Sequence, residues 1–542
     1  MKWLIHASLI ILALASIGLA QPQKTAQNEA RELWLVRAQN LTSDLLKDGA
    51  DLSNMQRAVL WGKLAQHWWR EDPKRARTWI LNAIEVVEPV PNKESPEERQ
   101  IRIGTAQALL AIVTPLDEKL SNRLLTVLSP DKSVEYDGGG TAFALIDAAI
   151  RILEDDPKRA AELGAQALRT GRPTNLDPLL YGLRARDPKL ADSLFVQALA
   201  LAKQDRGGMF TNILTYIAFP EQRGRSGNLP VPPDSLRIQL LQILMSLVTD
   251  RPASGENSNC GAVTWLAPLF GEFERLLPQQ WPILRQAINT CQSASPEIQQ
   301  RLKYNSSPQL DTVESLLRAA EEAKDLEVRT SYKYRAADLA YENKEYELAL
   351  KILDDLSTEE RELMAESWRS ARGGWAADGA VEHYKNGRFR EMNLMLDAVP
   401  SDLQPLAKAE FIQRLPEQTG SETGPITQIL NDAITGLRRS STPAEEKYNW
   451  YFPLIHATVK YQPAEANAVL KDAIASLNQV KDGRPLDQPD YFFGYMGPPL
   501  LELDEFVVKD ALASLTLVQT RTQLRLSLLA ATMQRLKSIS RN

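Results

Sequence analysis

The sequence predicts an all-α protein built as a stack of antiparallel helical hairpins, an α-solenoid. Apolar residues recur at helical spacing along most of the chain, and an Asp-Pro motif that starts helices is repeated. No convincing run alternates apolar and polar residues with β-branched enrichment, as strands would require. The composition, 44% hydrophobic and 24% charged, is ordinary for a soluble globular protein and excludes disordered or collagen-like classes.

The first twenty residues have the layout of a secretory signal peptide. A positively charged start, Met1-Lys2, precedes an almost continuous apolar run to residue 19. The small residues Gly18 and Ala20 then lie three and one positions before the expected cut. An uncleaved anchor is the alternative, but the run is short for a membrane span of about 20 residues. We therefore expect export to the periplasm or outside the cell, with cleavage near Ala20. We expect no membrane span in the mature chain.

The two cysteines, Cys260 and Cys291, fit an exported protein. In an oxidising compartment they can form a disulfide. The bond would close a loop of about 30 residues, for which chain entropy gives roughly 3.5–4 kcal/mol of stabilisation. Two buried free thiols are the alternative. The polar residues just before Cys260 are typical of an exposed turn and favour the disulfide.

Apolar residues three and four positions apart predict the helices in order along the chain. The 32 prolines mostly lie between such segments, where helices end and begin. Clear examples are Leu60, Leu64 and Trp68; Ile146, Ile150 and Leu153; and Leu512, Leu515, Leu517 and Val518.

The Asp-Pro motif is the most specific internal signal. Asp is a good N-cap, and Pro suits the first helical position, so each copy predicts a tight turn followed by a second helix. Small residues two turns apart on that helix let a neighbouring helix approach closely. The copies start at Asp72, Asp156 and Asp187, with a weaker one at Pro463. The packing alanines of the three full copies are Ala76 and Ala83, Ala160 and Ala167, and Ala191 and Ala198.

Two later segments resemble the middle of a tetratricopeptide repeat (TPR) of about 34 residues. The first has small residues at 336, 337 and 340, then Tyr346, a packing Ala349 and Leu353. The second, around residues 384–396, has Met392 in place of the alanine. Both lack the Trp and the Leu-Gly pair of the TPR's first helix. The resemblance implies a right-handed superhelix of the TPR-like or HEAT-like kind and a role as an interaction scaffold.

A polar stretch over residues 293–311, with Pro296 and Pro308, is the best candidate for a junction between two helical regions. We expect an N-terminal region of Asp-Pro hairpins over residues 21–305. A C-terminal region of TPR-like hairpins would cover residues 306–542.

Motifs that carry chemistry are mostly absent. The net charge of −6 argues against a nucleic-acid-binding face. The mature chain's histidines, His67, His383 and His456, have no second His or Cys at ligand spacing, so we expect no metal site. No nucleophile elbow, metalloprotease helix or phosphate loop occurs. We predict no catalytic residue and no cofactor.

One segment with many aromatic residues is a candidate for contact with a partner protein. Residues 490–499 carry four large rings among glycines and prolines, and aromatic anchors on loops are typical of binding surfaces. The alternative is a plug that covers the last helices. The four candidates are Tyr491, Phe492, Phe493 and Tyr495.

The sequence therefore favours an exported helical-repeat scaffold that binds another protein, without evident catalysis. One alternative is an all-α polysaccharide-active enzyme, a lyase or glycosidase on an α/α toroid. The other is a structural protein of the cell envelope, similar to the superhelical part of a soluble lytic transglycosylase.

Overall fold

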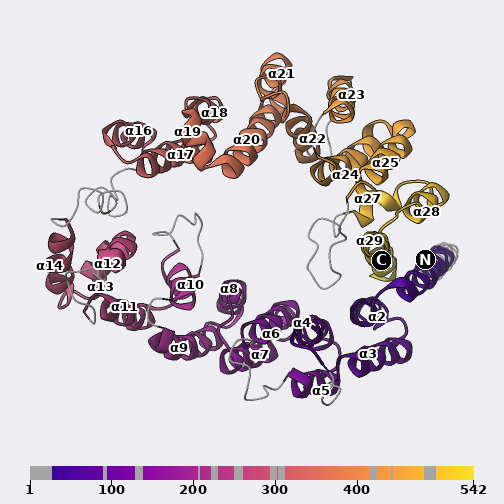
Figure 1. The fold of residues 1–542 in the computed structure, drawn as a ribbon, viewed down its shortest axis with the longest axis horizontal. Helices are drawn as coiled ribbons and strands as arrows, with labels where there is room; N and C mark the ends of the chain where they lie inside the picture. Colours follow the sequence, from indigo (N-terminus) through magenta and orange to yellow (C-terminus); the bar gives the residue numbers. More distant parts are fainter. Residues whose placement is uncertain are drawn as a thin grey trace, which may run out of the picture. The chain divides into compact units, whose positions relative to one another are not determined.

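The computed structural model describes residues 27–88, 94–128, 138–205, 208–220, 230–249, 260–292, 302, 312–415, 424–440, 443–480 and 496–541. Within these ranges every regular element is a helix, and none is a strand (Figure 1). The all-α prediction is confirmed for this part of the chain. The predicted signal peptide, residues 1–20, lies outside the described residues, and none of the described helices is long and apolar enough to span a membrane.

The contacts divide the chain into two compact units. The terminal unit combines residues 1–86 with residues 396–542, and the central unit holds residues 87–395. The junction predicted at residues 305 and 306 falls inside the central unit and outside the described residues. The two ends of the chain belong together because the first helices pack on the last ones, which no sequence pattern indicated.

The central unit runs from α4 to α20. Its elements are α4 (Pro96–Val113), α5 (Glu118–Leu128), α6 (Gly138–Ile152), α7 (Pro157–Thr170), α8 (Leu176–Arg186), α9 (Pro188–Asp205), α10 (Met209–Ala218), α11 (Asp234–Thr249), α12 (Cys260–Leu266), η3 (Ala267–Leu269), α13 (Phe270–Leu276), α14 (Trp281–Gln292), α16 (Val313–Glu322), α17 (Leu326–Glu342), α18 (Tyr346–Asp354), α19 (Thr358–Leu363) and α20 (Ala365–Lys385).

The terminal unit contains a helix over residues 27–48 and the last third of the chain. Its other elements are η1 (Gly49–Asp51), α2 (Asn54–Trp68), α22 (Gln404–Arg414), α23 (Gly424–Arg439), α24 (Ala444–Tyr461), α25 (Pro463–Leu477), α27 (Gly497–Leu501), α28 (Glu505–Ala513) and α29 (Val518–Arg541). At the boundaries between the units lie α3 (Pro73–Val87) and α21 (Phe389–Asp397).

The Asp-Pro motifs start helices as predicted. α3, α7 and α9 begin at the prolines of the three full copies. The Oδ1 atoms of Asp72, Asp156 and Asp187 accept hydrogen bonds from backbone N–H groups three residues on, at 3.1, 3.0 and 3.3 Å. The weaker copy also starts a helix, α25, but Gln462 before it makes no side-chain cap. The local prediction holds because both the cap and the proline act within one turn.

Consecutive helices pack as hairpins, and helices two apart also touch. α6 packs on α7, α8 on α9 and α24 on α25, while α7 also contacts α9 and α22 contacts α24. The approach is close at Gly164 of α7, where an added Cβ would lie 2.8 Å from Leu194 and 2.9 Å from Leu179. The six Asp-Pro alanines and Ala349 are all fully buried, which is what close helix packing requires.

The two hairpins for which the sequence predicts a resemblance to a TPR share one turn geometry. In α17–α18 the N–H of Lys344 donates to Tyr341 and that of Glu345 to Ala340, while in α20–α21 Gly387 and Arg388 repeat the pattern. This is the Schellman end, with Lys344 (φ 65°) and Gly387 (φ 70°) in the left-handed position.

The two turns are 43 residues apart (387 − 344) rather than 34. The additional residues include the short helix α19 and the 21-residue α20. An aromatic pair spans each turn: the centroids of Tyr341 and Tyr346 are 5.7 Å apart, and those of Tyr384 and Phe389 are 5.6 Å apart. The two hairpins therefore share one turn geometry and carry an aromatic pair at the same place across the turn.

Candidate functional site

The central unit carries a face where aromatic and acidic side chains alternate. On α17 these residues are spaced four and three apart, and on α20 three and four apart, so each set lies along one side of its helix. We call this the acidic aromatic face. It consists of Tyr334, Asp338 and Tyr341 of α17, Tyr346 of α18, and Trp375, Asp378 and Glu382 of α20.

The rings of the face form a continuous row. Tyr341 stacks on Trp375, with centroids 4.8 Å apart and planes 15° apart. Tyr334 meets the same indole at 6.2 Å, and Tyr346 meets Tyr341 edge to face at 5.7 Å. Trp375 is buried, whereas the three tyrosines are half-buried. The row therefore joins three helices and still leaves tyrosine surface in contact with solvent.

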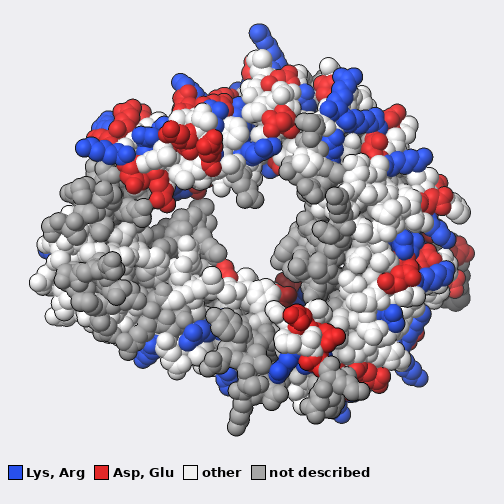
Figure 2. Space-filling view, in the orientation of Figure 1, with Lys and Arg blue, Asp and Glu red and all other residues white. Residues whose placement is uncertain are grey.

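Carboxylates lie beside these rings. The Tyr341 hydroxyl donates to Asp378 Oδ2 at 2.7 Å, which ties α17 to α20. Arg335 Nη1 pairs with Asp338 at 2.5 Å and with Glu342 at 3.6 Å. Figure 2 shows acidic side chains prominent over α16–α19, with basic ones between them.

The acidic surroundings act on the tyrosine hydroxyls. Burial, together with the negative charge of Asp338, raises the pKa of Tyr334. Burial, and then Asp378 and Glu382, raise the pKa of Tyr346 in the same way. Both hydroxyls therefore stay protonated at neutral pH and remain hydrogen-bond donors.

A buried ion cluster supports the face. Glu360 of α19 accepts hydrogen bonds from Lys333 Nζ at 2.9 Å, from Arg329 Nε at 3.0 Å and from the Ser357 N–H at 2.7 Å. Burial alone would raise the pKa of the Glu360 carboxyl. The three hydrogen bonds outweigh burial and lower the pKa to about 2. The cluster therefore stays ionised and fixes α17 against α19.

Two further contacts hold α18 on α20. Arg372 Nε and Nη2 bind the two carboxylate oxygens of Asp354 at 2.8 and 2.9 Å, and the Arg372 side chain is 2% exposed. His383 Nε2 lies 2.9 Å from Glu347 Oε1, and His383 is itself buried. A Cβ at Gly379 would lie 2.9 Å from the Cβ of Tyr346, so glycine permits the close approach that places Tyr346 on the face.

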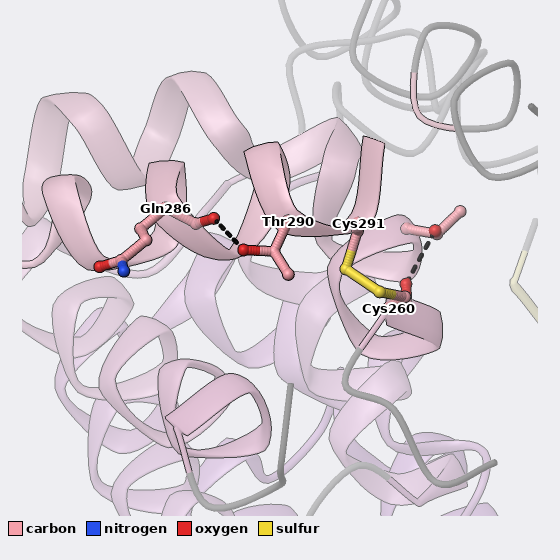
Figure 3. The surroundings of a disulfide bond; sticks show 5 residues. Cys260, Gln286, Thr290 and Cys291 are labelled. Carbon is pink, nitrogen blue, oxygen red and sulfur yellow. Dashed lines mark hydrogen bonds between the residues drawn. A yellow bond between two sulfur atoms is a disulfide. The ribbon is translucent and has the colours of Figure 1, made fainter. Parts of the chain in front are cut away.

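The predicted cysteine pair lies elsewhere in the central unit. In the structure Cys260, the first residue of α12, is joined by a disulfide to Cys291 near the end of α14, with Cα atoms 5.4 Å apart (Figure 3). Both residues are buried, so the pair lies in the core between two helices. Thr290 beside it donates to the Gln286 carbonyl within α14.

The remaining sequence predictions concern the aromatic segment, metal binding and the histidines. The aromatic candidates Tyr491, Phe492, Phe493 and Tyr495 lie outside the described residues. Among the residues that the structure does describe, no three His, Cys, Asp or Glu side chains gather as a metal ion would require. Burial, together with Lys537 and Lys63, lowers the pKa of His67 to about 4, so this imidazole is neutral at pH 7.

Comparison with known protein families and with curated proteins finds no match to this sequence. In the sequence Tyr346 stood out only as part of a repeat, and no pattern singled out Tyr341, Trp375 or Asp378. The sequence does place these side chains at helical spacing along one side of α17 and one side of α20. Which sides of the two helices meet, however, depends on how the hairpins pack.

Proposed function

We propose that this protein is an exported helical-repeat scaffold that binds another protein, with its hairpins stacked as a TPR-like, right-handed α-solenoid. The observation that carries the proposal is a pair of hairpins whose Schellman turns lie 43 residues apart (387 − 344), each with two aromatic rings in contact across the turn. Repeats of this kind contact their neighbours in the chain and leave one side of each helix open.

The acidic aromatic face is the surface we propose for the contact. Tyr and Trp dominate the binding energy of protein interfaces, where they sit on well-supported surfaces. Here the rings are held by the Tyr341–Asp378 hydrogen bond and by the ion pairs of Glu360 and Arg372. A surface held in one geometry loses little conformational freedom when a partner binds.

Export is the second part of the proposal. It is supported by the signal-peptide layout of residues 1–20 and by a disulfide between the chain's two cysteines. Disulfides persist mainly in oxidising compartments, outside the cytosol.

An all-α polysaccharide-active enzyme is the second candidate, and the same face is the observation that favours it. Aromatic rings beside carboxylates, such as Tyr334 beside Asp338, are also the groups that a sugar-binding cleft would use.

The test is a cross-linking pull-down with the mature protein, starting at Gln21, from the host's envelope fraction. We expect a discrete protein to be enriched over a heat-unfolded control. Enrichment of no protein would overturn the scaffold proposal. Retained glycan that is shortened on incubation would support the enzyme instead.

A further inference from the structure

We propose that Asn386 is a site of spontaneous deamidation, that the closed turn between α20 and α21 holds this reaction back, and that the modified residue keeps the turn open. Asn386 and Gly387 form the only Asn-Gly pair in the chain. Because glycine has no Cβ, its backbone nitrogen is the least hindered one that can follow an asparagine. Both residues are exposed, so water reaches the pair.

The reaction needs only the chain and water. The backbone nitrogen of Gly387 attacks Cγ of Asn386, so that a new C–N bond forms and the bond from Cγ to Nδ2 breaks. Nδ2 takes up the proton of the Gly387 N–H and leaves as ammonia, and a succinimide ring remains. Water then opens the ring at one of its carbonyls, which leaves aspartate or isoaspartate at position 386. No atom is oxidised or reduced.

The closed turn prevents this attack in two ways. With φ −92° and ψ 7°, Asn386 turns the nitrogen of Gly387 toward its own backbone nitrogen and away from the side chain that the attack must reach. The Gly387 N–H also donates to the Tyr384 carbonyl at 3.0 Å, so its proton is held. The attack therefore requires rotation about ψ and loss of this hydrogen bond, and both open the turn.

The side-chain amide of Asn386 is held as well. Its Nδ2 donates to the backbone carbonyl of Glu382 at 2.8 Å and to Glu382 Oε1 at 3.1 Å. A carboxylate in place of this amide loses both hydrogen bonds and lies beside the carboxylate of Glu382. Like charges four residues apart on a helix destabilise it, so the product disfavours the closed turn.

Isoaspartate disturbs the turn further, because it adds a backbone atom at position 386. The hydrogen bonds from Gly387 to Tyr384 and from Arg388 to His383 form the Schellman end, and the longer backbone no longer allows both with the same geometry. Opening of the turn thus permits the reaction, and the reaction in turn prevents closing.

The other Schellman turn provides a control within the same chain. Asn343 occupies the position of Asn386, with φ −78° and ψ 0°, and the N–H of Lys344 donates to a carbonyl three residues earlier at 2.9 Å. The closed turns therefore protect both asparagines. Lys344, however, has a side chain beside its nitrogen, and Leu339 stands four residues before Asn343, where Glu382 stands before Asn386.

Peptide mapping by mass spectrometry measures the reaction on the full mature chain, kept at physiological temperature and slightly alkaline pH. Digestion with pepsin in acid prevents further deamidation before the measurement. We expect Asn386 to react at least tenfold faster in guanidinium chloride than in the folded chain, and at least tenfold faster than Asn343 in the same denaturant. Less than tenfold protection by folding, or equal rates of the two asparagines in denaturant, would overturn the proposal.

Two matched truncations test whether this turn is the barrier. Phe389→Ala removes the ring that packs on Tyr384 across the reactive turn, and Tyr346→Ala removes the equivalent ring at the other turn. The first should speed deamidation of Asn386 in the folded chain at least threefold, and the second should leave it within about twofold. If Phe389→Ala has no effect, or if both variants speed the reaction equally, the turn is not the barrier and the proposal is wrong. Should circular dichroism show either variant unfolded, Phe389→Leu and Tyr346→Leu replace the pair with the same expectation.

The effect of the product is measured by substitution. Asn386→Asp supplies the carboxylate, and Asn343→Asp places the same charge at the same turn position without a glutamate four residues earlier. Hydrogen exchange over residues 382–390 should be at least threefold faster in Asn386→Asp, whereas residues 339–347 should change by less than about twofold in Asn343→Asp. Equal changes at the two turns would show that the charge of Glu382 does not matter and would refute the proposed effect.

Discussion

Asp48 joins the two ends of the chain, and its removal should loosen the terminal unit selectively. Its carboxylate accepts hydrogen bonds from Arg521 Nε at 2.9 Å and Arg525 Nη1 at 2.5 Å, both on α29. Asp48 ends the helix of residues 27–48, so the contact spans 477 residues of sequence at Arg525. The side chain of Asp48 is 6% exposed, and those of Arg521 and Arg525 are 19% and 10% exposed.

The expected magnitude follows from this burial. Removing one partner of a buried ion pair typically costs about 3–5 kcal/mol, because an uncompensated charge remains. Arg521 keeps a hydrogen bond to the Leu515 carbonyl at 3.0 Å, so we take the lower end, about 3 kcal/mol, for Asp48→Asn. Because about 1.4 kcal/mol corresponds to a factor of ten, this loss should make local opening of the contact roughly a hundredfold more frequent.

Hydrogen exchange read by mass spectrometry measures this opening segment by segment. Residues 27–48 and α29 should exchange about a hundredfold faster in Asp48→Asn, while α17–α20 of the central unit should stay unchanged. The control is Asp472→Asn, which breaks the more exposed pair with Arg438 (31% and 43% exposed) and should cost below about 1 kcal/mol.

Two outcomes would refute this reasoning. If Asp48→Asn and Asp472→Asn raise the hydrogen-exchange rates around their sites equally, burial does not strengthen the contact of Asp48 with Arg521 and Arg525. An apolar replacement of the whole cluster, Asp48→Leu with Arg521→Met and Arg525→Met, should recover most of the lost stability. If this triple variant is destabilised as much as Asp48→Asn, an unpaired buried charge is not the cause.

Three further predictions follow from the packing and the pKa values. The Glu360 pKa of about 2 lies below its ordinary 4.5, so the carboxylate stabilises the fold above pH 4.5, and this stabilisation, roughly 3 kcal/mol, is lost as the pH falls toward 2. Glu360→Gln should therefore lower the unfolding free energy of the α17–α19 region at pH 7 and leave it little changed at pH 2, as hydrogen exchange at the two pH values would show. Ala160→Leu and Ala191→Leu should each cost about 1–3 kcal/mol by overpacking fully buried sites, and an unchanged melting temperature in both would contradict the helix contacts described. Thiol labelling of denatured, unreduced protein from the exported fraction should find Cys260 and Cys291 oxidised, whereas two free thiols per chain would count against both the disulfide and the oxidising compartment.

The local structure of this protein could be predicted from its sequence wherever the signal acts within one or two helical turns. The helix starts at Pro73, Pro157 and Pro188 are examples, because the capping aspartate and the proline restrict the backbone at that point. The burial of Ala349 likewise follows from its place in a recognisable hairpin. For the same reason, the helical class of the protein was evident from the period of its apolar residues alone.

The tertiary structure decided which distant elements meet. Asp48 and Arg525 are ordinary charged residues in the sequence, and only the packing of the first helices on the last makes them a buried pair. Likewise, the stacking of Tyr341 on Trp375 depends on the angle and register between two hairpins, which the side chains of several helices set together. Caps and helical period are encoded locally, whereas the pairing of helix faces results from close packing over the whole unit, so the acidic aromatic face emerged only from the folded chain.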